Sequence, residues 1–541
     1  MSAPFDEACP TPPRPHGGRL YKLGLLTLGA LLYTIACPPY DWSGAGWIAL
    51  TPFFLALRQH TPRTGFVLGL LFGVLCCAGI GFWIYVAVTT YFALPFPLDI
   101  LFTLFNYGLF AGVYVGLVAV LVCVLFRHGS PLLVVLGAPA VWVAGEFARS
   151  TWFAGIAWEL LGYTQHQHPV LIQIADITGV YGLSYLLALS GAVGAEILVF
   201  LAAYARRETR AAPTQRFPMH AVVILAASVA VVVGYGARQL RHYDAPAAPE
   251  ARPLTVAVVH ANVESSQRWQ RAHYASTLLT YLRLTQQGIA NEQPNLIIWP
   301  EFALGFYLDR EPMFHQQLSA FTRATNAFLL VGAPRMDETD TGTQSYNSAY
   351  LLSPQGEVVD VYDKIRLIPF AEYLPFAHHL LRPTRSEVPN DFTPGHRATI
   401  FSQPHRPWGV TICYEVTYPP MSRRLVLEGA EFLVNISNDT WGAGEAAAAQ
   451  HFSMAVFRAV ENRRPLVRAA TAGISGFIDP VGRPYAVSAD AEGVRIGTIV
   501  PRSELTLYAR YGDWFALLCT AAAVLTLLSG VYQSRQARWQ P

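Results

Sequence analysis

Charged residues are scarce in this chain of 541 residues, of which 52% are hydrophobic and only 14% are Asp, Glu, Lys or Arg. The 38 basic and 36 acidic residues form no long run of either sign, which excludes the basic patch on which nucleic-acid binding depends. This composition is too apolar for an ordinary soluble protein. The length is sufficient for several domains. The sequence therefore predicts a membrane protein with more than one domain.

Long apolar runs gather toward the two ends of the chain, and we expect eight of them to cross a hydrocarbon layer of about 30 Å. The expected spans are 20–36, 44–57, 65–88, 100–126, 131–144, 180–204, 219–235 and 514–531. The second and the fifth are short enough to be re-entrant or buried segments instead. The spans contain almost no ionisable residues, which argues against a transporter with an ion-coupling path.

Basic residues flank these spans unevenly. Lys and Arg gather on one side of the predicted membrane, whereas the short loops of the other side contain only Arg149. By the positive-inside rule we expect both termini in the cytoplasm and the segment from about 236 to 513 outside it. The proline-rich beginning of the chain is typical of a disordered tail and not of a cleaved signal.

The outer segment has a different pattern, in which short β-branched runs alternate with helical stretches. LTVAVVHANV, NLIIWPE, AFLLVGAPR, SAYLLSPQGEVVDVYDK, WGVTICYE, AEFLVNISND and GISGFIDPVGR predict strands, and 272–290 and 450–461 predict helices. We expect an α/β domain with a mixed, largely buried sheet.

Cysteine is almost absent from this outer domain. Of the seven cysteines in the chain, Cys413 is the only one there, which excludes a disulfide within the domain and a cysteine-based metal site. A lone cysteine at the end of a strand is either a small buried hydrophobic residue or a nucleophile. The residues around it decide between the two.

Two charged stretches favour the nucleophile. Glu301 follows the apolar run LIIW and Pro300, and Lys364 lies in YDKIRLIPFAEYLPF, ahead of Glu372. Charged side chains at the ends of strands commonly form the active sites of α/β proteins. A Glu, a Lys and Cys413 at three strand ends would supply a general base, a cation and a nucleophile.

The motifs WPE, YDKIRLIPFAEYLPF and CYE, in this order, resemble the Glu-Lys-Cys triad of the nitrilase superfamily. With ISNDTW, FIDPVGR and the flanking spans, nearly the whole chain is similar to the apolipoprotein N-acyltransferase family. The chain departs from the family at Ala371, where Gly is usual, and in GAGEAAAAQH after Trp441. No role is predicted for that second loop.

The resemblance implies a transmembrane bundle of about eight helices that carries an external nitrilase-like αββα sandwich. The implied division is a cytoplasmic tail (1–19), seven transmembrane helices (20–237), the catalytic domain (238–510), and a last transmembrane helix with a cytoplasmic tail (511–541). It further implies a bacterial inner-membrane protein whose catalytic domain is periplasmic.

The resemblance implies an enzyme that needs no metal or other cofactor and acts as a monomer. An acyl chain would pass from a membrane phospholipid to Cys413 as a thioester, and then to the α-amino group of the diacylglyceryl-cysteine of an apolipoprotein. Glu301 would be the base, while Lys364 and the backbone N–H of Tyr414 would bind the oxyanion. The alternative is a membrane-tethered, nitrilase-like amidase that hydrolyses a small amide, with water attacking the thioester.

Four further residues match family positions: Trp269 on a mobile arm, Glu372 orienting Lys364 or the substrate, and Tyr414 and Glu415 shaping the turn at the nucleophile. Structural packing is the alternative for each of them. We expect His451 to make a structural hydrogen bond.

Three local expectations concern backbone segments of the outer domain. Cys413 should lie on a tight turn between a strand and a helix, and Pro419 and Pro420 should delay that helix until 421–428. FALGFYL after Glu301 and EYLPFAHHLL after Lys364 should either reach the bilayer surface or pack on the domain core.

Overall fold

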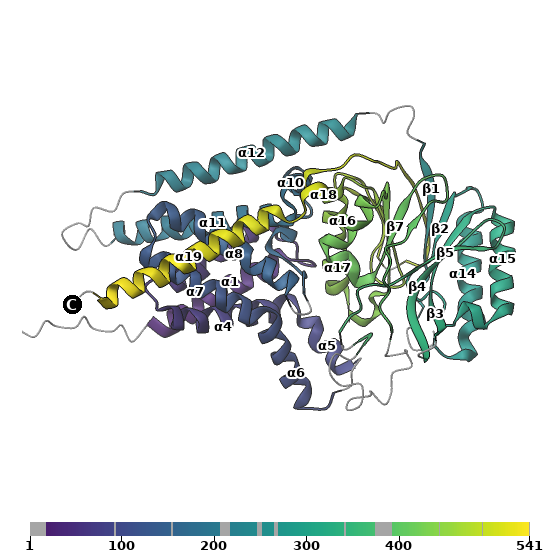
Figure 1. The fold of residues 1–541 in the computed structure, drawn as a ribbon, viewed down its shortest axis with the longest axis horizontal. Helices are drawn as coiled ribbons and strands as arrows, with labels where there is room; N and C mark the ends of the chain where they lie inside the picture. Colours follow the sequence, from purple (N-terminus) through teal and green to yellow (C-terminus); the bar gives the residue numbers. More distant parts are fainter. Residues whose placement is uncertain are drawn as a thin grey trace, which may run out of the picture.

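The computed structural model describes residues 18–539 except 91–93, 153–154, 206–216, 246–251, 264–268, 340–341, 370, 374–391, 443 and 490. Apolar helices form a bundle at one end of the molecule, and two β-sheets with their own helices lie at the other (Figure 1). The predicted N-terminal tail falls almost entirely outside the described residues.

The bundle contains a helix for every predicted span. Its helices are α1 Gly18–Ala36, α2 Ser43–Gly46, α3 Leu50–Leu57, α4 Pro62–Ile80, α5 Phe82–Thr90, α6 Leu98–Tyr107, α7 Val113–His128, α8 Pro131–Thr151, α9 Pro169–Ile172, α10 Ala175–Thr178, α11 Val180–Ala205, α12 Met219–Asp244 and α19 Trp514–Trp539. A π-helical turn, Gly108–Gly112, joins α6 to α7.

Six helices of the described chain are long and apolar enough to cross a membrane: α4, α6 continued into α7, α8, α11, α12 and α19. Ser43–Leu57 is a shorter apolar helical segment, and α1 is not among the six, so eight crossings remain a prediction. The prediction that the fifth span is short is wrong, because α8 continues to Thr151. Glu146 and Arg149 interrupt the apolar pattern there without ending the helix.

Small residues bring α4 and the α6–α7 helix into close contact. A Cβ atom added at Gly73 would lie 2.9 Å from Gly112 Cα, and one added at Gly69 would lie 2.5 Å from the carbonyl oxygen of Val115. Neither position tolerates a side chain, which is the packing mode expected of helices in a lipid environment.

The outer domain contains two six-stranded sheets, with strand orders β12-β1-β2-β3-β4-β5 and β11-β10-β9-β8-β7-β6. The strands are β1 Leu254–His260, β2 Leu296–Ile298, β3 Phe328–Thr339, β4 Gly342–Leu352, β5 Val358–Asp363, β6 Ile400–Phe401, β7 Trp408–Ile412, β8 Phe432–Ser437, β9 Leu466–Ala470, β10 Ser475–Ile478, β11 Pro484–Ser488 and β12 Gly493–Ile499. In each sheet three central strands are parallel (β1-β2-β3 and β7-β8-β9) and the outer ones are antiparallel.

Helices cover the outer faces of the two sheets. Helices α14 Tyr274–Gly288 and α15 Pro312–Thr325 cover the first sheet, and α16 Pro419–Leu427 and α17 Glu445–Asn462 cover the second, on the side facing the bundle (Figure 1). The short α18, Leu507–Tyr511, leads into α19. The predicted αββα sandwich carried by a helical bundle is confirmed.

Both faces of the parallel strands are buried. In β1, Val256 and Val258 point into the core between the sheets, while Ala257 and Val259 point into the core under α14 and α15. This is why the strand sequences are continuous apolar runs without polar alternation.

One local prediction is wrong, and one open alternative is decided. Helix α16 begins at Pro419 itself, so the prolines do not delay it; proline is tolerated in the first helical turn, where its missing N–H would have had no partner. Of the two alternatives for Phe302–Leu308, the structure shows packing on the domain core, with Ala303, Leu304 and Phe306 buried. Most of EYLPFAHHLL lies outside the described residues.

Helix α17 is the contact layer between the sandwich and the bundle. It is buried along nearly its whole length, and Gln450 at its middle bonds to three segments of the bundle. Its amide nitrogen donates to the carbonyls of Pro38 and Ile80 (3.0 and 2.9 Å), and its oxygen accepts from the indoles of Trp83 and Trp158 (3.0 and 2.8 Å).

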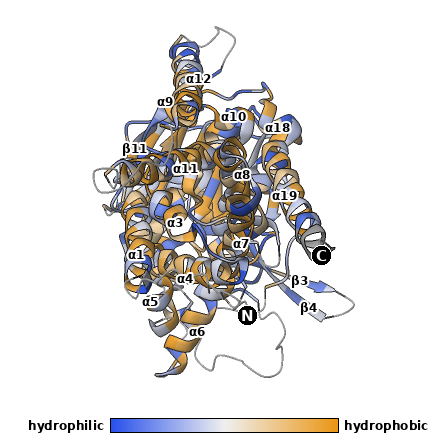
Figure 2. Cartoon of the chain, turned by 90° about the vertical axis from the view of Figure 1, so that its left-hand side faces the viewer, coloured by the Kyte–Doolittle hydropathy of each residue, from blue (hydrophilic) through white to orange (hydrophobic). Residues whose placement is uncertain are grey.

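The free end of the bundle lies away from the sheets. Helix α1 begins and α19 ends there (Figure 1), and Figure 2 shows this face with its predominantly apolar helices. The sandwich is therefore at the opposite end of the helices from both ends of the described chain.

Candidate active site

Cys413 begins a tight turn at the end of β7, as predicted. It has a φ of +51° and opens the short 3₁₀ helix Cys413–Thr417. A non-glycine residue in this backbone region is strained, and the surroundings must hold it. The carbonyl of Cys413 accepts hydrogen bonds from His451 Nε2 (3.1 Å) and Asn435 Nδ2 (3.3 Å). His451 thus contacts the backbone of the turn and has the structural role expected of it.

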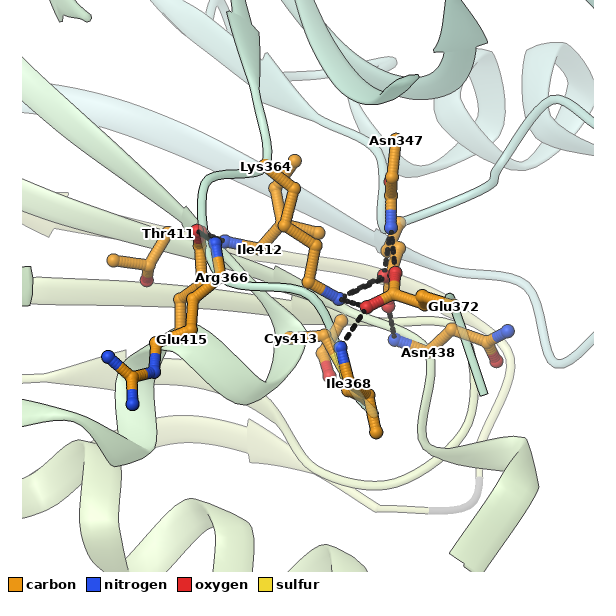
Figure 3. Close-up of polar contacts among 12 residues, drawn as sticks. Asn347, Lys364, Arg366, Ile368, Glu372, Thr411, Ile412, Cys413, Glu415 and Asn438 are labelled. Atoms are coloured by element: carbon orange, nitrogen blue, oxygen red, sulfur yellow. Dashed lines mark hydrogen bonds and ion pairs between the residues drawn. The ribbon is translucent and has the colours of Figure 1, made fainter. Parts of the chain in front are cut away.

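Glu415 connects this turn to the loop that carries Lys364. Its fully buried carboxylate accepts from the backbone N–H groups of Ile412 (2.8 Å), Ile365 (2.8 Å) and Arg366 (2.9 Å). The hydroxyl of Tyr362 donates to it as well, at 2.8 Å. A single carboxylate therefore fixes the spacing between the cysteine turn and the lysine loop (Figure 3).

Lys364 and Glu372 lie beside Cys413 (Figure 3), and Glu301 contacts Lys364. Lys364 Nζ lies 2.9 Å from Glu372 and 3.4 Å from Glu301 Oε1. Asn347 donates to both carboxylates, at 2.7 Å to Glu301 and 2.9 Å to Glu372. The second oxygen of Glu301 accepts from the backbone N–H of Asn438 at 2.8 Å. The side chains of Glu301, Lys364 and Cys413 are all buried.

Burial sets the protonation of these groups. It raises the pKa of Glu301 above its ordinary 4.5, against the opposing effect of the Lys364 charge. Burial alone would lower the pKa of Lys364, but Glu372 and Glu301 outweigh it and raise that pKa, so the side chain is an ammonium. Burial, and then the charge of Glu301, raise the pKa of the Cys413 thiol.

The resting cysteine is therefore a protonated thiol, and Glu301, whose charge helps to raise the pKa of that thiol, is the carboxylate that can accept its proton. Nucleophilic attack requires this transfer, because the thiolate is the reactive form.

The two remaining predicted residues are aromatic and lie around this centre. Trp269 packs edge-on against Phe302 with ring centroids 4.9 Å apart. Tyr414 stacks on Trp158 at 6.4 Å, and its hydroxyl accepts from Tyr418 at 2.9 Å. The functional roles of Trp269, Glu372, Tyr414 and Glu415 remain predictions.

Sequence reasoning missed the polar residues that support the site. Asn347 bridges the two carboxylates from the middle of β4, and Asn435 holds the Cys413 carbonyl from β8. Arg468 on β9 pairs with Asp439 at 2.7 Å, and Asp439 in turn holds His451 at 3.0 Å. A polar residue inside an apolar strand, as in SYNSAY and FLVNIS, was the available signal.

One cavity of about 320 Å³ connects the triad with the bundle. Cys413, Glu301 and Lys364 line one end of it, and the walls continue along α4, α5, α7 and α8 with mostly apolar side chains, among them Ile80, Val88, Phe110, Tyr114, Val118 and Trp142. Among the described residues, no group of three or more His, Cys, Asp or Glu side chains is placed to hold a metal ion.

A buried Glu-Lys-Cys centre at the strand ends of an αββα sandwich defines an enzyme of the carbon-nitrogen hydrolase class, and the carbon-nitrogen hydrolase family model matches residues 255–509. The family model for the apolipoprotein N-acyltransferase N-terminal domain matches residues 29–193. The chain belongs to the apolipoprotein N-acyltransferase family, and it is a membrane-bound acyltransferase.

Named relatives match over almost the full length. The chain is 36% identical to the apolipoprotein N-acyltransferase of Geobacter metallireducens, over 93% of this chain and 94% of that protein. It is 30% identical to that of Pseudomonas syringae pv. tomato, over 90% and 93%. The crystal structure of Saccharomyces cerevisiae Nit3, a member of the nitrilase superfamily, aligns with 47% of this chain and 93% of its own at 18% identity and a TM-score of 0.37.

Proposed function

We propose that this protein transfers an acyl chain from a membrane phospholipid to the α-amino group of the N-terminal diacylglyceryl-cysteine of apolipoproteins, through a thioester on Cys413. The cavity carries the proposal, because it joins the triad to the apolar walls of the bundle. Moving a chain of about 16 carbons from lipid into water costs roughly 12 kcal/mol at about 0.8 kcal/mol per CH₂. An apolar passage that continues from the bundle to the nucleophile avoids that cost.

In the first half-reaction, Glu301 accepts the thiol proton while Cys413 Sγ attacks the ester carbonyl. The Lys364 ammonium and the backbone N–H of Tyr414 stabilise the tetrahedral oxyanion. The C–O bond to glycerol then breaks, and Glu301 returns the proton to the departing oxygen. The products are a lysophospholipid and the thioester.

In the second half-reaction, the neutral α-amine of the diacylglyceryl-cysteine attacks the thioester carbonyl. Glu301 accepts the ammonium proton as the C–N bond forms, and it returns this proton to sulfur when the C–S bond breaks. The amide product and the resting thiol result.

The other predicted residues hold the catalytic groups in place or line the cavity. Glu372 holds the Lys364 ammonium at 2.9 Å, and Glu415 holds the turn at Cys413. Tyr414 and Trp269 line the aromatic side of the cavity. We assign the enzyme, as a monomer, to the bacterial inner membrane, with the domain division given by the sequence and the sandwich in the periplasm.

Acyl transfer is tested with purified enzyme, a phospholipid labelled in its acyl chains, and a diacylglyceryl-cysteine peptide. We expect the label in an amide on the peptide and, when peptide is omitted, on the enzyme. The same peptide with an acetylated amine is the control and should remain unlabelled. Labelled fatty acid as the main product, with or without peptide, would indicate the amidase and contradict the transfer.

The proposed orientation is tested with reporter fusions. Since α1 begins and α19 ends at the far end of the bundle from the sandwich, and basic residues gather at the predicted cytoplasmic flanks, a reporter after Pro541 should be active only in the cytoplasm. A reporter inserted at the exposed residues 291–293, between α14 and β2, should be active only in the periplasm. If the reporter in that loop were active in the cytoplasm, the proposed orientation would be wrong, and the sandwich would face the cytoplasm.

A further inference from the structure

Arg149 is a charged residue in the wall of the cavity, and the mechanism above does not use it. It lies in the last turn of α8 and lines the cavity together with Cys413 and Lys364. A cation inside a mostly apolar, membrane-facing wall is costly unless it has a partner, so it indicates a functional site by default.

Two hydrogen bonds fix the position of this guanidinium. Its Nη2 donates to the carbonyls of Trp158 at 3.0 Å and Glu159 at 3.4 Å. Both acceptors are neutral backbone oxygens. They orient the side chain but leave its charge uncompensated.

The nearby carboxylates Glu146 and Glu159 bond to other groups and form no direct ion pair with it. Glu146 accepts from the indole of Trp142 (3.0 Å) and the N–H of Leu161 (2.8 Å), and Glu159 accepts from Ser453 at 3.1 Å. Burial raises the pKa of Glu159 to about 8, so this carboxyl is largely neutral at pH 7. Within the described part of the chain, Arg149 forms no ion pair, and its Nε and Nη1 have no hydrogen-bond partner.

Arg149 lies in the same cavity wall as the nucleophile and is linked to it through Trp158 and Tyr414. Its acceptor Trp158 stacks on Tyr414, and Tyr414 directly follows Cys413. A ligand whose carbonyl lies at Cys413 Sγ therefore shares one cavity with the Arg149 guanidinium.

The chemistry of the donor fits this arrangement. In a phospholipid, the three-carbon glycerol unit holds a phosphodiester at a short, fixed separation from the acyl esters. A guanidinium presents paired N–H donors that match two phosphate oxygens. We propose that Arg149 binds the phosphodiester of the phospholipid donor and thereby places its acyl ester at Cys413.

This inference rests on the proposed acyl transfer and makes it more specific. The diacylglyceryl-cysteine acceptor has no phosphate, so Arg149 should act in thioester formation and not in the transfer to the amine. It should also act only on donors that carry a phosphodiester.

The test compares two acyl donors in uncharged detergent micelles: dipalmitoyl phosphatidylethanolamine and the phosphate-free ester p-nitrophenyl palmitate. Thioester formation on Cys413 is followed by intact mass in the parent and in Arg149→Gln, Arg149→Lys and Arg127→Gln. Arg127 lies in the last turn of α7 and is not part of the cavity wall, so its variant is the matched control for loss of an arginine charge.

We expect Arg149→Gln to slow thioester formation from the phospholipid by about 10- to 100-fold, the range for losing charge-assisted hydrogen bonds. The rate from p-nitrophenyl palmitate, and amine transfer from the preformed thioester, should stay within about twofold of the parent. Arg149→Lys should recover part of the loss because it keeps the charge without the paired donors. Arg127→Gln should match the parent with both donors.

Equal losses with both donors would show that Arg149 only shapes the 155–160 loop, and no loss with the phospholipid would show that it binds no phosphate; either result overturns the inference. Inorganic phosphate is added in a separate arm. Strong inhibition of the parent by it would indicate a site for a free anion instead of a lipid headgroup. A parent that forms a thioester from neither donor would contradict the proposed function itself.

Discussion

Cys413→Ala is expected to abolish acyl transfer and the acyl-enzyme together. Cys413 is the only cysteine in the outer domain, it lines the cavity together with Glu301 and Lys364, and removing its thiol leaves no nucleophile to form the covalent intermediate. By comparison with other covalent enzymes, the loss should be on the order of 10⁴-fold or more. Cys413→Ser should be nearly as inactive, since an alkoxide is much harder to form near neutral pH than a thiolate.

Intact mass of the enzyme after incubation with phospholipid measures this result. The parent should carry one acyl group that hydroxylamine removes, and Cys413→Ala none. Cys519→Ala is the control, because Cys519 lies in α19 and is not part of the cavity wall, and it should behave as the parent. An adduct on Cys76 or Cys77, which do line the cavity, would be incompatible with the proposed nucleophile.

Glu301→Gln is expected to block the formation of the acyl-enzyme, with a loss of roughly 10²- to 10⁴-fold, the range for a general base. One oxygen of Glu301 accepts from Asn347 and Lys364, and the other accepts from the N–H of Asn438. An amide can supply only one of these acceptors and cannot take the thiol proton.

Two measurements separate loss of the base from loss of structure. Glu372→Gln is the comparison variant, because Glu372 holds Lys364 but accepts no proton in the cycle; its loss should be smaller, and its acyl-enzyme should still form. Only the ionised carboxylate of Glu301 can accept the thiol proton, and burial raises its pKa. The rate of thioester formation by the parent should therefore be highest above that pKa and should fall as the pH drops through it. A midpoint at or below the ordinary value of 4.5, or a normal burst of acyl-enzyme in Glu301→Gln, would remove Glu301 from the role.

The charged residues of the site could be predicted because each follows an apolar run at the end of a strand. Glu301, Lys364 and Cys413 lie in short motifs with a fixed order, and parallel strands bring such ends together. Asn347 and Asn435 lie within strands, where an uncharged polar residue follows no spacing rule. Only the folded arrangement shows that each bonds a group of the triad.

The missed elements have related causes. Strand β9, LVRAA, is not among the predicted strands, because Arg468 interrupts its apolar run. The structure shows that Arg468 is fully buried and paired with Asp439. Helix α8 continues past its apolar run through Glu146 and Arg149, whose charges end the apolar pattern but not the helix. The cavity joins residues from both halves of the chain, and no local pattern encodes a contact over such a separation.

The four hydrogen bonds of Gln450 join the sandwich to the bundle, and they limit how the two halves can evolve or be engineered separately. A sandwich cut out of the chain would expose the apolar face of α17 to water and lose all four bundle partners of Gln450, so we do not expect truncation alone to give a soluble outer domain. The same bonds require that changes on α17 and on the loops at Pro38, Ile80 and Trp158 occur together. The two halves are thus expected to melt in a single cooperative transition and to be inherited as one unit.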